Sequence, residues 1–186
     1  MQKTAVVVFV GMPGAGKSSC VSYLEAKSIP SVYFGGIVVK ETVRRYGKTS
    51  EEHEKIVREE FREKEGLGAL AKRIIPEIDE LLKTNSRVVA DGLYSWSEYK
   101  EFKNHFGDKV CFIAIAAPRN VRHERLANRP ERPLTDQEIS TREYAEIENL
   151  EKGGPIANAD YTIVNETTAE ELMTKLDKIL QRISFI

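Results

Sequence analysis

A glycine-rich run near the start of the sequence carries the residues best suited to chemistry. In "FVGMPGAGKSSC" (9–20), Gly11, Gly16, Lys17 and Ser18 satisfy the pattern G-x-x-x-x-G-K-[ST], directly after the apolar stretch "AVVVFV". Glycines let backbone N–H groups turn towards a phosphate, the lysine can reach the β and γ phosphates, and the serine hydroxyl can ligate Mg²⁺. A tight strand-to-helix turn alone would not need a lysine and a hydroxyl at these offsets. We therefore predict that ATP and Mg²⁺ are bound by Gly11, Met12, Pro13, Gly14, Ala15, Gly16, Lys17, Ser18 and Ser19.

A carboxylate follows a second apolar run. In "RVVADGLYSW", Asp91 ends a predicted strand and Gly92 opens a loop, which is where open α/β sheets place ligand-binding groups. Such a carboxylate can hold Mg²⁺ through water or accept a proton from an attacking hydroxyl. An aspartate before glycine is also common as a plain turn or cap residue. Beside a phosphate-binding loop we favour the functional interpretation, with Asp91 and Lys17 catalytic and with Asp91 and Ser18 as metal ligands.

Arginines gather in the stretch "VRHERLANRPERPLTDQEISTRE" (121–143). Arginines that close over a nucleotide can neutralise the charge of a transferring phosphoryl group. Arg125 and Arg129 lie four residues apart and are predicted to share a helix face, so we rank them first as catalytic residues. Acidic residues are interleaved, so a solvated helix face is the alternative for any single arginine. The arginines of this stretch are Arg122, Arg125, Arg129, Arg132 and Arg142.

A second basic cluster, "KETVRRYGK", follows the second predicted strand. Lys40, Arg44 and Arg45 could grip an anionic acceptor, and a charged surface helix is the equally good alternative.

The apolar runs between these motifs predict the fold. Five of them are rich in β-branched residues and show little polar alternation, as expected of parallel strands covered on both faces. Helical patterns lie between them, and Pro76 falls inside one, which it could kink or split. Alternation of strand and helix implies right-handed crossovers and a doubly wound α/β fold. The predicted strands span 5–10, 31–34, 87–91, 110–116 and 161–164, and the predicted helices 17–27, 38–46, 51–63, 67–83, 96–106, 119–128, 136–151 and 169–183.

Length and composition limit the class of protein. With 186 residues and no linker or repeat, one domain spanning 1–186 is expected. The net charge of -1 gives no reason to expect a nucleic-acid partner. Cys20 and Cys111 lie in apolar segments, which indicates buried thiols in a reducing compartment. No apolar run approaches the ~20 residues of a membrane span, so a cytoplasmic location is expected.

Several segments together resemble the nucleotide monophosphate kinases, most closely adenylate-kinase-related proteins best known from archaea, with dephospho-CoA kinase as a more distant relative. They are "GMPGAGKSS", "GGIVVKE", "REKEGLGALAKRIIPEI", "VVADGLYS", "RHERLANR" and "ANADYTIVNETTAEEL". The resemblance implies a three-layer α/β/α P-loop fold with a five-stranded parallel sheet ordered 2-3-1-4-5. It further implies a helical acceptor-binding insertion over 36–86 and a short lid over 119–145. By the same resemblance, Asn165 and Thr167 would lie near the adenine of ATP.

The sequence departs from that family at the acceptor. Where members tend to have G-D-x-x-R, this chain has Gly36 to Lys40, without the aspartate and with lysine for arginine. Where an arginine follows D-G, this chain has Asp91-Gly92-Leu93-Tyr94. A lysine lacks the bidentate fork of a guanidinium and a tyrosine carries no charge. We therefore predict an altered acceptor site formed by Lys40, Arg44, Arg45 and Tyr94 instead of ordinary adenylate kinase activity.

Three functions remain open from the sequence. The main prediction is an ATP- and Mg²⁺-dependent phosphotransferase acting on a nucleotide-like or other small phosphorylated acceptor. A kinase acting on a hydroxyl, as dephospho-CoA kinase does, would need a base, and Asp91 could serve although "VYFGG" lacks the carboxylate that family carries near its second strand. A nucleotide-binding switch would bind ATP and signal to a protein partner. A nucleic-acid-end kinase would call for a basic channel, which the charge does not suggest.

Overall fold

A computed structural model describes residues 4–130 and 133–186. Its strands form one parallel sheet in the order β2-β3-β1-β4-β5, which confirms the predicted order and the α/β class. Parallel pairing aligns Phe9 of β1 with Asp91 of β3 and Ile113 of β4. The carboxyl ends of the strands therefore meet at one edge, where the glycine-rich loop begins. The strands are β1 (Val6–Val10), β2 (Ser31–Tyr33), β3 (Val88–Asp91), β4 (Val110–Ala116) and β5 (Tyr161–Val164).

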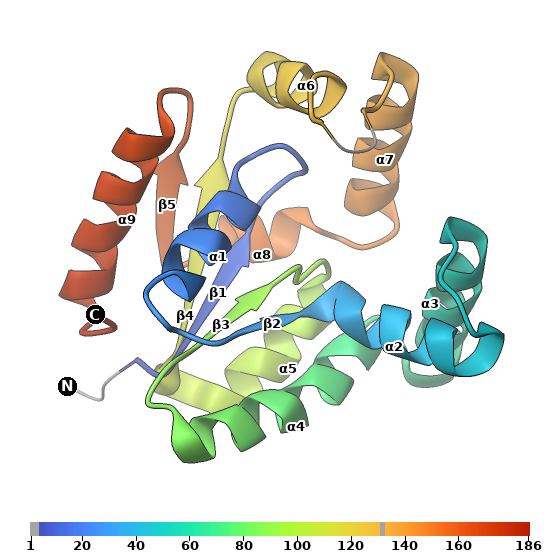
Figure 1. The fold of residues 1–186 in the computed structure, drawn as a ribbon, viewed down its shortest axis with the longest axis horizontal. Coiled ribbons are helices and arrows are strands. Elements are labelled where there is room, and N and C mark those ends of the chain that lie inside the picture. Colours follow the sequence, from blue (N-terminus) through green and yellow to red (C-terminus); the bar gives the residue numbers. More distant parts are fainter. Residues whose placement is uncertain (1–3, 131–132) are drawn as a thin grey trace.

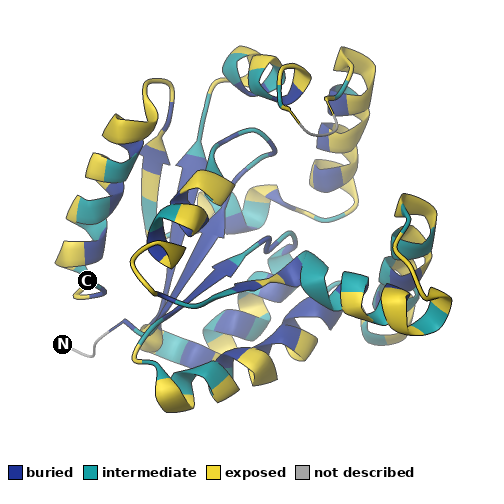
Figure 2. Ribbon diagram, in the orientation of Figure 1, coloured by how far each residue is buried: buried dark blue, intermediate teal, exposed yellow. Residues whose placement is uncertain are grey.

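Helices cover both faces of the sheet, and most of their outward-facing residues are exposed (Figures 1 and 2). Three of them lie in sequence between β2 and β3, and the pair after β4 lies beyond the carboxyl edge of the sheet (Figure 1). The helices are α1 (Lys17–Glu25), α2 (Phe34–Tyr46), α3 (Glu51–Glu65), α4 (Ala69–Thr84), α5 (Trp96–Phe106), α6 (Arg119–Ala127), α7 (Asp136–Glu148), α8 (Gly153–Ala157) and α9 (Ala169–Arg182), with a 3₁₀ turn at Gly107–Lys109.

The core forms two clusters, one on each face of the sheet. Alternation along β1 sends Val6, Val8 and Val10 to one cluster and Val7 and Phe9 to the other. The first cluster is closed by α2, α3, α4 and α5, and the second by α1 and α9. Because both faces are covered, every residue of β1 is buried, which explains its continuous apolar sequence.

Several boundaries differ from the predictions. Phe34 begins α2 instead of ending β2, because its buried side chain stacks on Phe102 below the sheet and the chain turns there. The short helix α8 was not predicted, since "GGPIA" has neither length nor periodicity. Pro76 does not split α4. The proline removes the N–H that would donate to the carbonyl of Lys72, but both residues are exposed, so water can reach that carbonyl instead.

The arginine segment also differs. α6 ends at Ala127, so Arg129 lies beyond the helix, and the prediction that it shares a helix face with Arg125 is wrong. Arg132 lies outside the described residues.

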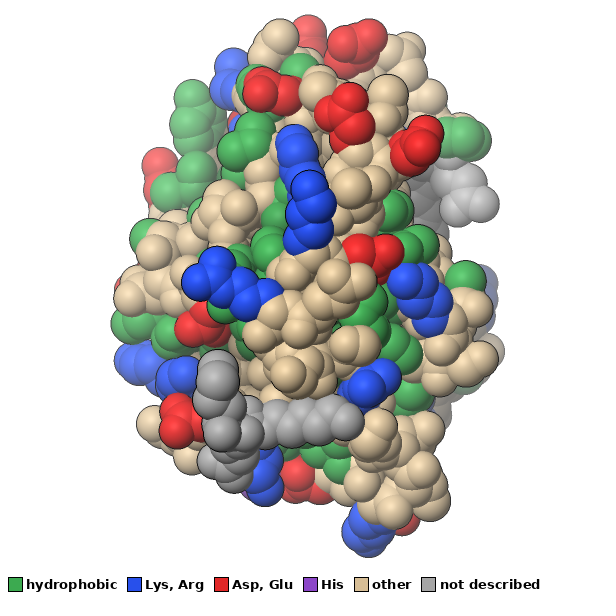
Figure 3. All heavy atoms as spheres, turned by 90° about the vertical axis from the view of Figure 1, so that its left-hand side faces the viewer, with side chains coloured by type: hydrophobic (Ala, Val, Ile, Leu, Met, Phe, Trp, Pro, Cys, Tyr) green, Lys and Arg blue, Asp and Glu red, His purple; other side chains and the backbone are tan. Residues whose placement is uncertain are grey.

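The surface shown in Figure 3, to the left in Figure 1, mixes charges of both signs. Lys and Arg side chains are interspersed there with Asp, Glu and hydrophobic side chains, so that face offers no continuous basic channel. Within residues 4–130 and 133–186, no helix has both the length and the apolar composition needed to cross a membrane. Cys20 and Cys111 are free and buried as predicted, and burial raises the pKa of each thiol to about 12.

Candidate nucleotide site

The loop between β1 and α1 needs its glycines for steric reasons. Gly11, Gly14 and Gly16 all have positive φ angles, of 144°, 77° and 108°. A Cβ on Gly11 would lie 2.2 Å from the carbonyl oxygen of Ile115, and one on Gly16 would lie 2.3 Å from the side chain of Asn165. The loop is therefore packed against the ends of β4 and β5 in a conformation that other residues would disrupt.

The backbone of this loop suits a bound polyphosphate. Its only backbone hydrogen bonds among described residues run from Ala15 N to Met12 O (3.2 Å) and from Cys20 N to Gly16 O (3.4 Å). No described group accepts from the remaining amides at the helix start, which are those of Gly14, Gly16, Lys17, Ser18 and Ser19. Converging amides at the positive end of a helix favour an anion. The residues present thus fit the phosphates of a nucleotide, whose γ-phosphoryl group would supply the chemistry when bound.

Lys17 lies over the same loop. Its Nζ donates to the carbonyl oxygens of Gly11 (2.9 Å) and Met12 (3.2 Å). Burial, together with the nearby charge of Lys152, lowers its pKa to about 8, although the charge of Asp91 opposes both effects. Ser18 and Ser19 are exposed at the start of α1, so the Ser18 hydroxyl is available to a metal ion.

Asp91 ends β3 beside the loop. Parallel pairing sets it level with Phe9, two residues before Gly11, and with Tyr33 at the end of β2. Burial raises its pKa, while the charges of Lys17 and Lys152 lower it. Its half-buried carboxyl group can hold Mg²⁺ with Ser18, or take a proton from a hydroxyl, as the sequence predicts.

A buried lysine that no sequence pattern predicts completes this edge. Lys152, after α7, is 1% exposed, and its Nζ pairs with Glu146 and lies 4.4 Å from the centre of the Tyr94 ring. Burial lowers the pKa of Lys152, and Glu146 opposes that effect. Arg142 also contacts Glu146, at 3.0 Å. Tyr94 thus lies beneath the ammonium group of Lys152 and adds no positive charge of its own to the site.

Arg125 and Asn165 fasten the loop to the β5–α9 connection. Arg125 donates to the carbonyl oxygens of Gly14 (3.4 Å) and Asn165 (3.2 Å). Asn165 is buried, and its side chain donates to Ala15 O (2.7 Å). Both residues therefore contact the backbone of the glycine-rich loop, whereas Thr167 is exposed in the β5–α9 connection. Their roles towards the nucleotide stay predictions.

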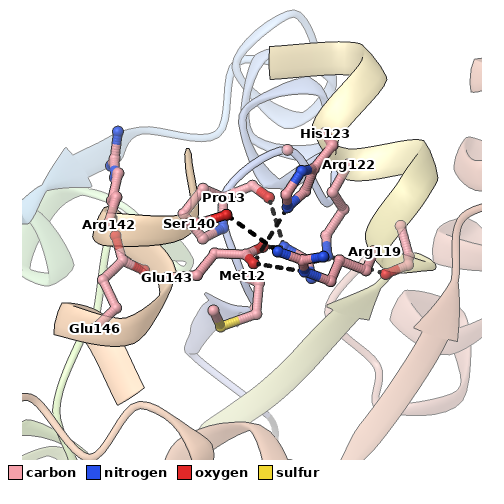
Figure 4. Close-up of polar contacts among 12 residues, drawn as sticks. Met12, Pro13, Arg119, Arg122, His123, Ser140, Arg142, Glu143 and Glu146 are labelled. Atoms are coloured by element: carbon pink, nitrogen blue, oxygen red, sulfur yellow. Dashed lines mark hydrogen bonds and ion pairs between the residues drawn. The ribbon is translucent and has the colours of Figure 1, made fainter. Parts of the chain in front are cut away.

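Glu143 of α7 anchors α6 to the loop (Figure 4). Arg122 is buried, pairs with Glu143, and donates to Pro13 O (3.4 Å). Arg119 and His123 each approach the same carboxylate at 3.3 Å. Burial alone would raise the pKa of Glu143, but hydrogen bonds from Arg122, His123 and Arg119 hold it below its usual range. Arg122 therefore positions the loop.

The predicted acceptor cations are engaged elsewhere. Lys40, which is 71% exposed, pairs with Glu77 of α4, and Arg44 and Arg45 both pair with Glu41. Arg45 also pairs with Glu60. These three residues thus pair with carboxylates of α2 itself, α3 and α4, and their contact with an acceptor stays a prediction. Arg129 is half-buried after α6.

The sequence of this chain is similar to those of known proteins over almost its whole length. The profile described as "AAA domain" matches residues 7–151. A UPF0200 protein of Thermococcus onnurineus is 33% identical over 181 residues, which cover 96% of this chain and 97% of that one. The chain belongs to the UPF0200 family. A UPF0200/UPF0201 protein of Archaeoglobus fulgidus is 36% identical over 183 residues, but this UPF0200 chain spans only 56% of that relative's length.

Solved structures share the fold of this UPF0200 protein. Shikimate kinase from Aquifex aeolicus aligns with a TM-score of 0.53 and 25% identity, over 95% of this chain and 96% of that one. Dephospho-CoA kinase from Campylobacter jejuni aligns with a TM-score of 0.55 and 16% identity, over 97% of each chain. The loop of Gly11 to Ser18 is therefore a P-loop in a kinase-like fold, which implies nucleotide binding.

Proposed function

We propose that this UPF0200 protein is an ATP- and Mg²⁺-dependent phosphotransferase that acts on a small anionic acceptor. The observation that carries the proposal is a P-loop in which most amides at the start of α1 donate to no described group, with Lys17 above it and Asp91 at the end of the adjacent strand. In-line phosphoryl transfer needs chiefly positioning and charge neutralisation. This edge of the sheet supplies both.

In the proposed reaction, an acceptor oxygen bonds to the γ-phosphorus of ATP as the bond to the β–γ bridging oxygen breaks, and ADP leaves. Lys17 balances charge on the phosphates, and Ser18 and Asp91 would hold Mg²⁺. Arg125 and Arg129 are proposed to support the phosphates from α6 and the segment that follows it, and Asn165 and Thr167 to border the base. An acceptor that is already an ionised phosphate needs no base.

Transfer to a hydroxyl is the second candidate. It is supported by Asp91, since this carboxyl beside Lys17 has a raised pKa and could take the hydroxyl proton. It is also supported by the names of similar structures, which include a shikimate kinase, a gluconokinase and a dephospho-CoA kinase.

The test is ADP release from Mg-ATP, alone and with AMP, CMP, UMP, dGMP, dephospho-CoA, gluconate and shikimate. Lys17→Ala serves as the inactive variant, and Lys178→Ala, which removes an exposed lysine of α9 outside the predicted site, serves as its matched control. Stimulation by one acceptor, retained in Lys178→Ala and lost in Lys17→Ala, supports the proposal. Tight ATP binding with no stimulation would instead favour a nucleotide-binding switch, and absence of ATP binding would refute both.

A further inference from the structure

Two arginines on α3 are unusual among the cations near the site. Arg58 and Arg62 lie four residues apart, so they occupy one side of the helix. Within the described residues, neither takes part in a hydrogen bond or ion pair, and the Nε of Arg62 is buried without a partner. Lys40, Arg44 and Arg45 on neighbouring α2 are all paired with carboxylates. A half-buried guanidinium without a partner is costly to keep, which points to a ligand.

The surroundings of Arg62 connect it to the proposed transfer site. Arg62 interacts electrostatically with Glu98, Arg58 and Tyr94, and Tyr94 interacts in turn with Asp91. The cation of Lys152 lies over the Tyr94 ring. Tyr94 therefore lies near enough to interact both with Arg62 of α3 and with Asp91 at the end of β3.

Two carboxyl groups act on Arg62 through their charge, Glu98 and, more weakly, Glu59. Glu98 does not form an ion pair with Arg62 within 4.0 Å, and its Oε2 instead accepts from the amides of Tyr94 (2.6 Å) and Ser95 (3.0 Å). Glu98 is fully buried, and burial raises its pKa to about 7, so that its negative charge is only partly present at neutral pH. The two guanidinium groups therefore keep a net positive charge beside Tyr94.

We propose that Arg58 and Arg62 bind an anionic group of the acceptor, a carboxylate or a phosphate, next to Tyr94. That the bound anion belongs to a phosphoryl acceptor rests on the proposed kinase function. Binding of an anion by these two arginines does not depend on turnover. The substrate class is then a small molecule with two functional ends. One end is an anion for the α3 arginines, and the other is an oxygen that receives the phosphoryl group near Asp91. The planar guanidinium can donate two parallel hydrogen bonds to one carboxylate or phosphate group, whereas the ammonium of a lysine cannot.

The anion site is tested in the Lys17→Ala protein, in which the P-loop lysine is absent. Inorganic phosphate and malonate are titrated separately and binding is measured by calorimetry. We expect at least one probe to bind, and Arg62→Gln or Arg58→Gln in this background to weaken that binding tenfold or more. Lys55→Gln removes an exposed cation from the same helix and is expected to change it less than twofold. The stronger probe tells a phosphate site from a carboxylate site.

Unchanged affinity in Arg62→Gln, or no binding of either probe, would overturn the inference. Urea unfolding of each variant shows that the fold persists, and Arg62→Lys, which keeps the charge without the fork, is expected to retain part of the affinity. Failure of the proposed function is distinguishable, because it would appear as no acceptor-stimulated ADP release while anion binding persisted. Once an acceptor is known, Arg62→Gln is expected to raise its KM at least tenfold while kcat changes less.

Discussion

Lys17 illustrates how burial prepares a side chain for a polyanion. It is held against two carbonyl oxygens of its own loop, and burial together with the charge of Lys152 lowers its pKa to about 8. Phosphates would stabilise its charged form, so its pKa must be higher in the complex than in the free protein. Binding of nucleotide is then linked to uptake of a proton.

Nucleotide affinity is therefore expected to fall as the pH rises above about 8. Between the free and the bound pKa of Lys17, the dissociation constant should increase by up to about tenfold per pH unit. Calorimetry with Mg-ADP at pH 7 to 9.5, in buffers of different ionisation enthalpy, measures both the affinity and the proton uptake. Lys17→Ala should bind weakly at every pH without this dependence. A flat affinity across the range in the unsubstituted protein would contradict the assignment.

Glu98 gives a second pH dependence, in stability. Burial raises its pKa to about 7 from the usual 4.5, so the folded protein binds more protons than the unfolded chain between these values. The free energy of unfolding should therefore fall as the pH rises from 4.5 to 7, by up to roughly 3 kcal/mol from this group. Urea unfolding at several pH values should show this slope reduced in Glu98→Gln, whose amide oxygen can still accept from Tyr94 N and Ser95 N. An equal slope in both proteins would disprove the effect of Glu98.

At the scale of elements, α6 and α7 are joined to the P-loop by one buried carboxylate. Glu143 pairs with Arg122, which in turn donates to Pro13 O, and Arg119 and His123 approach the same group. Removing the carboxylate of Glu143 leaves the buried guanidinium of Arg122 without an opposite charge.

We expect Glu143→Gln to destabilise the protein by about 3 kcal/mol. It should also weaken nucleotide binding, because Arg122 would no longer be held against Pro13. Glu148→Gln, an exposed change on the same helix, should alter stability by less than about 0.5 kcal/mol. Urea unfolding and ADP titration measure the two effects, and equal stability of the two variants would refute this role.

Pro76 offers a test of α4 itself. The helix continues through the proline at an exposed position, where the missing N–H leaves the carbonyl of Lys72 without its helical donor. Pro76→Ala restores that hydrogen bond and improves helix propensity, which stabilises the folded protein. It also increases the conformational entropy of the unfolded chain, which lowers the free energy of unfolding by about 1 kcal/mol. The expected net effect is stabilisation of about 1 kcal/mol, measured by urea unfolding. Destabilisation would show that Pro76 supports the packing of α4.

At the scale of the whole molecule, two apolar clusters share one sheet. Ile74 of α4 and Leu176 of α9 are fully buried on opposite faces, and both clusters contain side chains of β1, β3 and β4. Loss of either cluster would expose the strands that the other needs.

Ile74→Ala and Leu176→Ala should each cost about 2–5 kcal/mol. Because the two side chains belong to separate clusters, the double variant should lose the sum to within about 0.5 kcal/mol. Urea unfolding followed by circular dichroism and by tryptophan fluorescence should give one coincident transition in each protein. Separate transitions from the two probes would mean that the faces unfold independently.

Local patterns in the sequence predict the P-loop and the five strands, because glycine spacing and runs of β-branched residues act over a few neighbouring positions. The order of the strands is predicted only from the resemblance to nucleotide monophosphate kinases. The same patterns misplace Arg129, since a helix end depends on where the chain next packs. Lys152 and Glu143 acquire their importance only in the folded protein. Nothing beside them in the sequence distinguishes them from surface charges. Only tertiary packing decides that Lys152 is buried over Tyr94 and that Glu143 is buried among two arginines and a histidine. Arg44 and Arg45 of α2 pair with Glu41 of the same helix, as their spacing allows, but only tertiary packing adds the ion pair of Arg45 with Glu60 of α3. Tertiary packing also leaves Arg58 and Arg62 without a hydrogen bond or ion pair among the described residues, because no carboxylate of a neighbouring element reaches them.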